Sequence, residues 1–275
     1  MKNKLTNISS ISSAIRSFNL PSVVSSDESK KINEYDGFRI EIANTIPQLM
    51  DAANLAYRGY LKKGFVSKSE LPFVFKEWDV SGISVCLVAY DDEHNCVGTM
   101  TIVPDFENLP VDVTFSDELN DLRSKGHNLC EFTRFIIDEN FRNQKCLLTA
   151  LMEWSPLVVE FYFHGTDIIV EVNPRHKGFY TKKLLFKTET GIKNCPLVND
   201  APAVLLRLSV NNFKEQRSNL PDDATCKRLV YSAFISKDKS KLDNMIKYVL
   251  KHANKIQPQL SLLNYLAPTF KSKVS

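Results

Sequence analysis

The chain has 275 residues, of which 43% are hydrophobic and 24% are charged, with a formal net charge of +3. This composition is typical of a globular protein with one large domain, or one domain with appendages. No two of its nine glycines are separated by a single residue, which excludes the GxGxxG dinucleotide fingerprint. The sequence also contains no GxxxxGK[ST], GxSxG, HExxH or CxxC string. The nucleotide-binding, hydrolase and zinc classes that use these motifs are therefore excluded.

The six cysteines have neither the spacing of a metal site nor that of a disulfide framework, and several lie in apolar runs. We expect reduced thiols in a cytoplasmic protein, with no bound metal. The first 21 residues lack the apolar core of a signal peptide, and no run of about 18 apolar residues could span a membrane. The cysteines are Cys86, Cys96, Cys130, Cys146, Cys195 and Cys226.

The positive charge is concentrated at the C-terminal end. Residues 211–275 contain 12 Lys and Arg against five Asp and Glu. Such a tail could attract an acidic carrier protein, make a weak peripheral contact with an anionic membrane, or form a solvated helix face. No Arg-rich groove with interleaved aromatic residues is present, so we expect no nucleic-acid partner.

The N-terminal part of the chain predicts a leader, a strand, two helices and a hairpin. Residues 1–35 are rich in Ser, Asn and Lys, as in a mobile leader. Residues 38–42 alternate apolar and polar side chains, which predicts a strand. Thr45 and Gln48 form a capping-box pattern that predicts a helix ending near Gly64. A second short helix is predicted over residues 69–78, and a β-hairpin over residues 85–90 and 96–103.

The rest of the chain alternates helices and strands. The order predicts a mixed α/β (α+β) fold, with a largely antiparallel sheet, helices on both faces and one parallel crossover in the middle. We expect one domain over residues 36–210 and a basic helical extension over residues 211–275. The predicted helices cover residues 117–124, 147–163, 174–185 and 239–251, and the predicted strands cover residues 129–138, 167–172 and 203–210.

Three stretches carry a resemblance to a known family. The first runs from Asp117 to Gly126 and leads into Cys130-Glu-Phe-Thr-Arg-Phe-Ile-Ile137. The second is Glu171-Val-Asn-Pro-Arg-His-Lys-Gly-Phe-Tyr180 followed by Leu185-Phe186, and the third is Val198 to Arg207. With Arg58-Gly-Tyr60 and Leu109-Pro110, these stretches resemble the N-acyl amino acid synthase (FeeM-type) family over roughly residues 38–210. That family has an acetyltransferase-like (GNAT) fold and is related to the acyl-homoserine-lactone synthases.

The resemblance implies transfer of a long-chain fatty acyl group from an acyl carrier protein thioester to the α-amine of an amino acid. No cofactor would be bound, because the acyl phosphopantetheine is itself the donor substrate. Acetyltransferases hold the coenzyme A pyrophosphate on a glycine-containing turn, whereas the corresponding residues 141–146 contain no glycine. This favours carrier protein as the donor. An acyl-CoA-dependent N-acyltransferase, a homoserine-lactone-type synthase and a non-catalytic carrier-binding module are the alternatives.

Two residues of the first stretch are candidates for the reaction centre. Thioester aminolysis needs a proton acceptor for the amine, and Glu131 lies in an otherwise apolar strand. Alternatively, Glu131 points outward or pairs with Arg134. Arg134 could hold the carboxylate of the amino acid in a bidentate contact, or pair structurally with an acid. Simple alternation puts Arg134 on the opposite face from Glu131 unless a β-bulge intervenes.

The remaining candidates have binding roles or a second catalytic role. Arg58 is another candidate for the carboxylate, and a backbone N–H near Phe135 could meet the oxyanion. Tyr180 could protonate the departing thiolate, or simply pack against Phe179. Asn173 could bond the pantetheine amide. His176 would line the donor channel rather than bind a metal. We also expect Arg175 to bind substrate. An acyl tunnel, or ordinary core, would be built from Phe132, Phe135, Leu148, Leu151 and Met152.

Overall fold

The computed structural model describes residues 32–69, 72–80, 82–106, 108–141, 145–212, 215 and 239–254. Within these residues the chain forms one sheet, in the order β1-β2-β3-β4-β5-β6-β9-β7, with β8 paired to β9. The strands are β1 (Glu34–Tyr35), β2 (Phe38–Ile42), β3 (Val85–Asp91), β4 (Cys96–Pro104), β5 (Leu129–Ile137), β6 (Asp167–Val172), β7 (Lys187–Thr188), β8 (Lys193–Cys195) and β9 (Ala201–Ser209).

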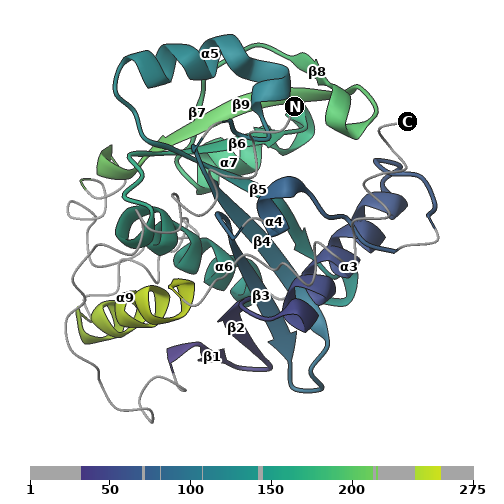
Figure 1. Cartoon of the computed structure of the whole chain (residues 1–275), viewed down its shortest axis with the longest axis vertical. Coiled ribbons are helices and arrows are strands. Elements are labelled where there is room, and N and C mark those ends of the chain that lie inside the picture. The colour runs from purple at the N-terminus through teal and green to yellow at the C-terminus, as the bar shows by residue number, and fades with distance from the viewer. Residues whose placement is uncertain are drawn as a thin grey trace, which may run out of the picture.

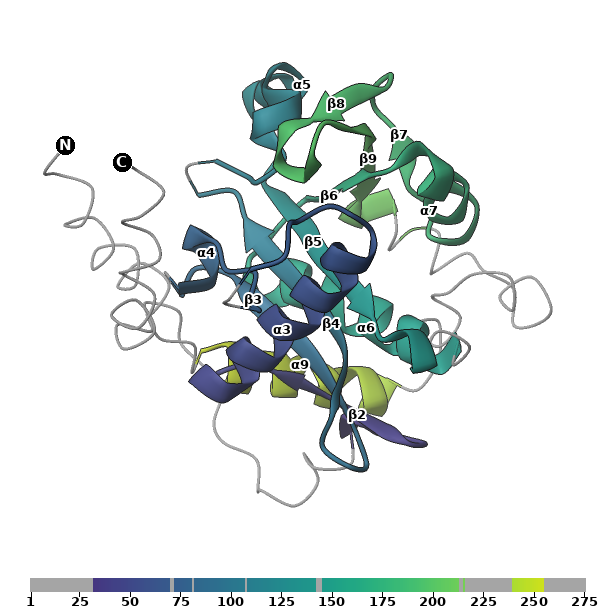
Figure 2. The same cartoon turned by 90° about the vertical axis from the view of Figure 1, so that its right-hand side faces the viewer.

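Helices cover both faces of this sheet, as the sequence predicts (Figure 1). The helices α3 and α5 pack on one face, where Ala52 meets Val88, and α6 and α9 pack on the other, where Leu151 meets Leu87. In Figure 2, α3 lies in front of the sheet. The α-helices are α3 (Ile46–Lys62), α4 (Glu77–Val80), α5 (Asp112–Ser124), α6 (Lys145–Leu157), α7 (Lys177–Lys183) and α9 (Lys239–Ala253).

The pairing of β5 with β6 is the one parallel pairing in the described sheet. The predicted fold class, a mixed and mostly antiparallel sheet with a central parallel crossover, is therefore confirmed. The pair is short: it runs from Leu129 opposite Asp167 to Glu131 opposite Ile169, and ends there. Both strands continue beyond this point without pairing to each other.

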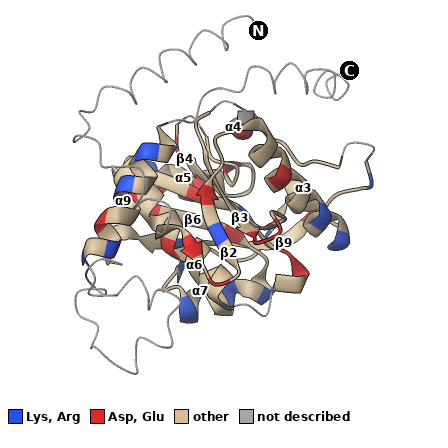
Figure 3. Cartoon of the chain, turned by 90° about the horizontal axis from the view of Figure 1, so that it is seen from below, with Lys and Arg blue, Asp and Glu red and all other residues tan. Residues whose placement is uncertain are grey.

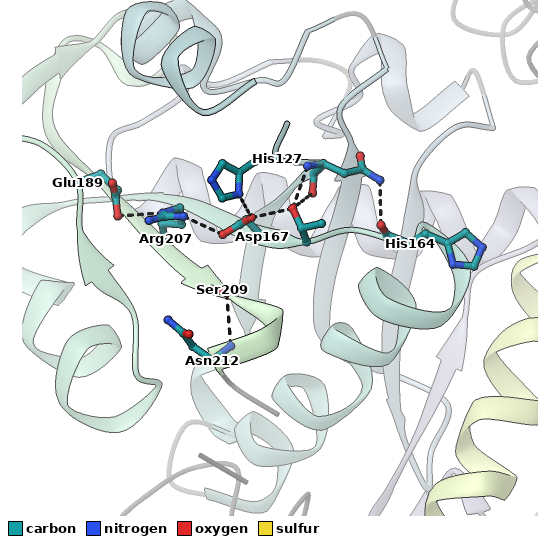
Figure 4. A network of polar contacts seen from close by, with 9 residues as sticks. His127, His164, Asp167, Glu189, Arg207, Ser209 and Asn212 are labelled. Atoms are coloured by element: carbon teal, nitrogen blue, oxygen red, sulfur yellow. Dashed lines mark hydrogen bonds and ion pairs between the residues drawn. The ribbon is translucent and has the colours of Figure 1, made fainter. Parts of the chain in front are cut away.

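A polar network lies at the closed end of the parallel pair. Asp167 is 1% exposed, and its carboxylate lies 2.6 Å from His127 Nδ1 and accepts a 3.0 Å bond from Arg207. Arg207 in turn bonds Glu189, and Thr166 Oγ1 donates to Asp167. Figure 4 shows the side chains of His127 and Arg207 directed at Asp167 from two sides. The network ties the beginnings of β5 and β6 to the end of β9.

Several elements confirm the sequence analysis closely. Thr45 caps α3 in a capping box with Gln48, and the hairpin, the strand over residues 38–42 and the strand over residues 167–172 are all present. The helix predicted over residues 147–163 is α6 followed by a π-helical turn, Val158–Tyr162. The last predicted helix of the domain is a 3-10 turn, Pro174–His176, followed by α7.

The helix predicted over residues 69–78 is wrong, because residues 72–76 are not helical. Pro72 cannot donate a helical hydrogen bond, and its carbonyl accepts from the Asn54 side chain. Val74 N–H bonds the carbonyl of Ala53, so the segment is held by α3 instead. Strands β7 and β8 were not predicted from the sequence, and α5 begins five residues before the helix predicted there. Glu34 and Tyr35 of the expected leader pair with β2, whereas residues 1–31 lie outside the described residues.

Among the described residues, no helix has both the length and the apolar character that a membrane crossing requires.

We expect the network at Asp167 to be a major source of stability. Asp167→Ala removes the contacts to His127, Thr166 and Arg207 together and leaves a buried space, and the loss of hydrogen bonds to a charged group costs about 1.5–3 kcal/mol. Asp121→Ala, which removes an exposed partner of Lys125, should cost roughly 0.5 kcal/mol or less. Urea denaturation of both variants measures the difference. Equal losses would contradict the importance assigned to the network.

Candidate active site

A cavity of about 680 Å³ opens where β5 and β6 part. Because the two strands stop pairing after Glu131 and Ile169, the rest of each strand forms one wall. The other walls come from α3, from the turn and helix after β6, and from the segment that leads into β9. This volume is typical of a small-molecule site. The described residues contain no group of three or more His, Cys, Asp or Glu side chains that could hold a metal ion.

A β-bulge in β5 decides which residues face the cavity. Thr99 pairs with Ile136 and Thr101 with Thr133, so β5 has one residue more than β4 in this interval. The extra residue brings Arg134 to the face of the sheet that carries Glu131, with a positive φ of 50° at Arg134. Glu131 and Arg134 therefore share a face of the sheet, as the sequence predicts on condition that a bulge intervenes.

Arg134 is 8% exposed and is bonded mainly within the protein. It forms an ion pair with Asp79, and it donates to Val74 O at 2.9 Å and to Thr101 Oγ1 at 2.8 Å. Its Nε atom is buried and has no hydrogen-bond partner among the described residues. Arg134 thus has the structural pairing that the sequence analysis left open, and it also lines the cavity with one donor unused.

Glu131 is a buried acid on the cavity wall, 3% exposed. Its Oε2 accepts a 2.9 Å bond from the backbone N–H of Val111, at the N-terminus of α5. Burial raises the pKa of Glu131 well above its ordinary value, the charges of Glu171 and Asp112 add to the rise, and the bond from Val111 opposes it. A carboxylate of raised pKa is a stronger proton acceptor near neutral pH.

Glu171 is a second acid in the cavity that the sequence analysis did not single out as a site residue. Thr114 Oγ1 lies 3.3 Å from its Oε1, and burial raises the pKa of Glu171, opposed by hydrogen bonds from Cys195 and Thr114. The sequence did contain a signal for it. Glu171 follows Ile169 by two residues in a strand, so the two share one face of the sheet.

Two tyrosines line the cavity, Tyr60 from α3 and Tyr180 from α7. Tyr180 packs edge-on against Phe179, with ring centroids 5.6 Å apart, and also against Phe186. Burial raises the pKa of its hydroxyl.

Tyr60 of α3 was not a predicted site residue. Burial raises the pKa of Tyr60 to about 12, while the charge of Arg134 lowers it. Tyr60 follows Gly59, where a Cβ would lie 3.1 Å from the Ile136 side chain, so the missing side chain lets α3 approach β5.

The residues that follow β6 also line the cavity, and Arg175 and His176 are exposed to solvent there, at its mouth. The Asn173 side chain accepts from the Arg175 N–H and donates to the carbonyl of Pro202, both at 3.2 Å. Arg175 Nε lies 3.1 Å from His176 Nε2. Burial lowers the pKa of His176, and the charges of Arg175 and Lys63 lower it further. These three predicted residues therefore meet in one place.

Other predicted residues divide between the cavity and the rest of the structure. Phe132, Phe135 and Leu148 line the cavity, whereas Leu151 and Met152 are fully buried core residues that do not. Arg58 is also absent from the lining: its side chain is 55% exposed and pairs with Asp138 at 3.5 Å. The structure thus separates Arg58 from the other predicted site residues.

The raised pKa of Glu131 should make the wild type less stable as pH rises. The unfolded state ionises near its ordinary pKa of 4.5, so stability is greatest below that pH and falls as pH rises through the folded-state pKa. Glu131→Gln can keep the Val111 bond without the buried charge. We expect this variant to gain stability relative to the wild type between pH 5 and pH 8 in urea denaturation. A pH-independent difference would contradict the buried-charge argument.

The sequence profile of the family described as N-acyl amino acid synthase FeeM matches residues 51–209, more than half of the chain. No curated protein sequence matches. The solved structure of FeeM, from uncultured soil microbes, has 21% identity and a TM-score of 0.54, and the match covers 72% of this chain and 96% of FeeM.

The acyl-homoserine-lactone (AHL) synthase LasI has 10% identity and a TM-score of 0.45, over 63% of this chain and 90% of LasI. A putative N-acetyltransferase from Lactobacillus plantarum has 16% identity and a TM-score of 0.43, over 63% of this chain and 99% of that one. The match to the solved FeeM structure shows a shared fold. The match to the family profile, over more than half of the chain, shows membership of the family. The chain belongs to the N-acyl amino acid synthase FeeM family, and it is an N-acyltransferase.

Proposed function

We propose that this enzyme transfers a long-chain fatty acyl group from the phosphopantetheine thioester of an acyl carrier protein to the α-amine of an amino acid. The observation that carries the proposal is the buried carboxylate of Glu131 in a cavity between parted strands. A buried acid with a raised pKa accepts a proton from an attacking amine near neutral pH. Membership of an N-acyl amino acid synthase family supports the choice of an amino acid as acceptor.

In the proposed reaction Glu131 takes the proton of the amine as it attacks the thioester carbon. The bulge leaves Arg134 and Phe135 without a partner in the register with β4, and the backbone N–H of Phe135 meets the oxyanion. Tyr180 donates its proton to the departing thiolate. The unused Nε of Arg134 receives the carboxylate of the amino acid, and Asn173 orients the pantetheine.

In this proposal each of the two substrates binds on a different face of the sheet. Phe132 projects into the core under α6, and Leu148 of α6 lines the cavity beside it. Glu131 projects from the opposite face, where the backbone of Val111 bonds it. We therefore place the acyl chain on the α6 side, the amino acid on the α5 side, and the thioester in the gap between β5 and β6.

Basic side chains at the cavity mouth support a carrier protein as donor. Arg175 lines the cavity at its exposed end, and Lys182 and Lys183 are exposed on the following helix, α7. Figure 3 shows that α9 also carries Lys residues, but α9 packs on β2 and α6 and does not line the cavity. The glycine-free turn that favours carrier protein over coenzyme A includes residues 142–144, which lie outside the described residues.

We further propose a cytoplasmic enzyme in which residues 36–210 form the transferase domain and residues 211–275 an extension. The five described cysteines form no disulfide with one another, which is consistent with a reducing compartment. In the extension, α9 is the described helix, and it covers the sheet face opposite α3.

The proposal predicts new acyl amides in bacteria that express the wild type. Mass spectrometry of lipid extracts should find fatty acyl amino acids, and Glu131→Gln should reduce their amount by about 10² or more, because the proton acceptor is lost. Glu93→Gln, in the exposed β3–β4 turn, is the matched control and should leave the products unchanged. Undiminished product from Glu131→Gln would refute the role of Glu131.

Carrier docking at α7 predicts a change specific to the protein donor. The double variant Lys182→Gln and Lys183→Gln should raise the KM for acyl carrier protein by about tenfold at low salt, and leave the KM for acyl pantetheine unchanged. The matched control is Lys247→Gln with Lys251→Gln, which are exposed on α9. An effect of the α9 pair instead would indicate docking on the C-terminal extension, and salt-independent affinity would refute electrostatic docking at either place.

A further inference from the structure

The cavity contains two carboxylates on one face of the sheet, and the proposed reaction so far uses only one. Glu131 and Ile169 are paired in the parallel register, so their side chains share a face, and Glu171 lies two residues further along β6. Helix α5 contacts both acids: the Val111 N–H bonds Glu131 at 2.9 Å, and the Thr114 hydroxyl lies 3.3 Å from Glu171. One helix thus fixes both carboxylates beside the gap.

The two acids have no paired cation among the described residues. In the described part of the chain, no Lys, Arg or His forms an ion pair with Glu131 or Glu171. The cation deepest in the cavity, Arg134, is already paired with Asp79. The groups that face Glu171 are the neutral Thr114 hydroxyl and Cys195 thiol. The groups whose charges act on Glu131 are Glu171 and Asp112.

Aminolysis by an amino acid releases two protons from nitrogen. The acceptor arrives mainly as an ammonium ion and must lose one proton before its nitrogen can attack. It loses the second when the C–N bond forms. The C–S bond then breaks and the thiolate takes up one proton, so one proton per turnover leaves for solvent. In the proposed reaction Glu131 accepts one of these two protons, and the other proton still requires an acceptor.

We propose that Glu171 is the second proton acceptor, which converts the entering ammonium ion into the amine before Glu131 takes the proton released on attack. This inference rests on the proposed function. After attack, the proton held by Glu131 replaces the one that Tyr180 gives to the thiolate. The proton held by Glu171 is the one released to solvent.

The different burial of the two acids is consistent with these two separate roles in proton transfer. Glu131 is 3% exposed, so a proton on it is retained within the site. Glu171 is only partly buried and can exchange its proton with water between turnovers. Burial raises the pKa of both carboxyl groups, so each is a stronger proton acceptor than an exposed carboxylate. The negative charge of Glu171 also attracts the ammonium ion to the place where deprotonation is needed.

The test is the pH dependence of the deficit caused by Glu171→Gln. Purified variants receive acyl carrier protein thioester and the twenty amino acids at equal concentration, and the products are measured by mass spectrometry. At pH 7 we expect a rate about 10²-fold below the wild type. As pH rises towards 9.5 the amine arrives already neutral, so the deficit should shrink to about fivefold or less. Glu131→Gln should stay deficient across this range, because attack still releases a proton.

Three further variants separate catalysis from structure. Glu171→Asp keeps a carboxylate and should recover part of the rate at pH 7. Thr114→Val removes only the hydroxyl partner and should have a smaller effect than Glu171→Gln. Glu93→Gln should match the wild type. A deficit that is the same at every pH, or a Glu171→Gln rate within threefold of wild type at pH 7, would overturn the role of Glu171.

A pH-independent deficit accompanied by a changed choice of amino acid would also overturn it, since that result assigns Glu171 to recognition of the acceptor side chain. Absence of acyl amino acids from the wild type itself would overturn the proposed function, and this role with it. Product from the wild type with any of the contrary results above would overturn only the role of Glu171.

Discussion

The structure depends on a parallel strand pair that closes at one end and opens at the other. Asp167 holds the closed end, because its buried carboxylate bonds groups at the beginnings of β5 and β6 and near the end of β9. Beyond Glu131 and Ile169 the pairing stops, although both strands continue. A sheet interior normally satisfies its backbone by pairing. Here the strands instead leave a cavity that a substrate with polar and apolar parts can fill.

Glu131 on the cavity wall and Asp79 behind Arg134 are buried acids that lower the stability of the fold, and Glu131 is available for proton transfer. Burial raises the pKa values of Glu131 and Asp79, so at neutral pH each contributes less to stability than an exposed carboxylate would. Asp79 is compensated by Arg134, whereas among the described residues Glu131 is stabilised by the Val111 N–H and the partial positive charge at the start of α5. The residue left least compensated is the one with the greatest tendency to take a proton. Strained or costly groups of this kind are expected at functional sites.

Local patterns predicted the elements well, and the contacts between distant segments less well. The Thr45 cap and the alternation of residues 38–42 depend on neighbours in sequence, and both were predicted correctly. The helix prediction around Pro72 was wrong because Ala53 and Asn54 of α3 bind the backbone of that segment. The β-bulge at Arg134 could be named only as a condition, because it depends on the register with β4. Arg58 was a candidate from its sequence neighbours, but its helix turns it towards Asp138.

The alternation of side chains in β5 and β6 gives the two faces of the sheet beside the gap different chemical character. Phe132 and Val170 point into the apolar core with α6, while Glu131 and Glu171 lie on the other face, beside α5. An acyl chain gains by leaving water on the first face, and an ammonium ion gains by meeting carboxylates on the second. In the proposed reaction the two substrates therefore meet in the gap, where the strands no longer pair. A shift of either strand by one residue would exchange the faces, so the register that Asp167 helps to fix also fixes the chemistry.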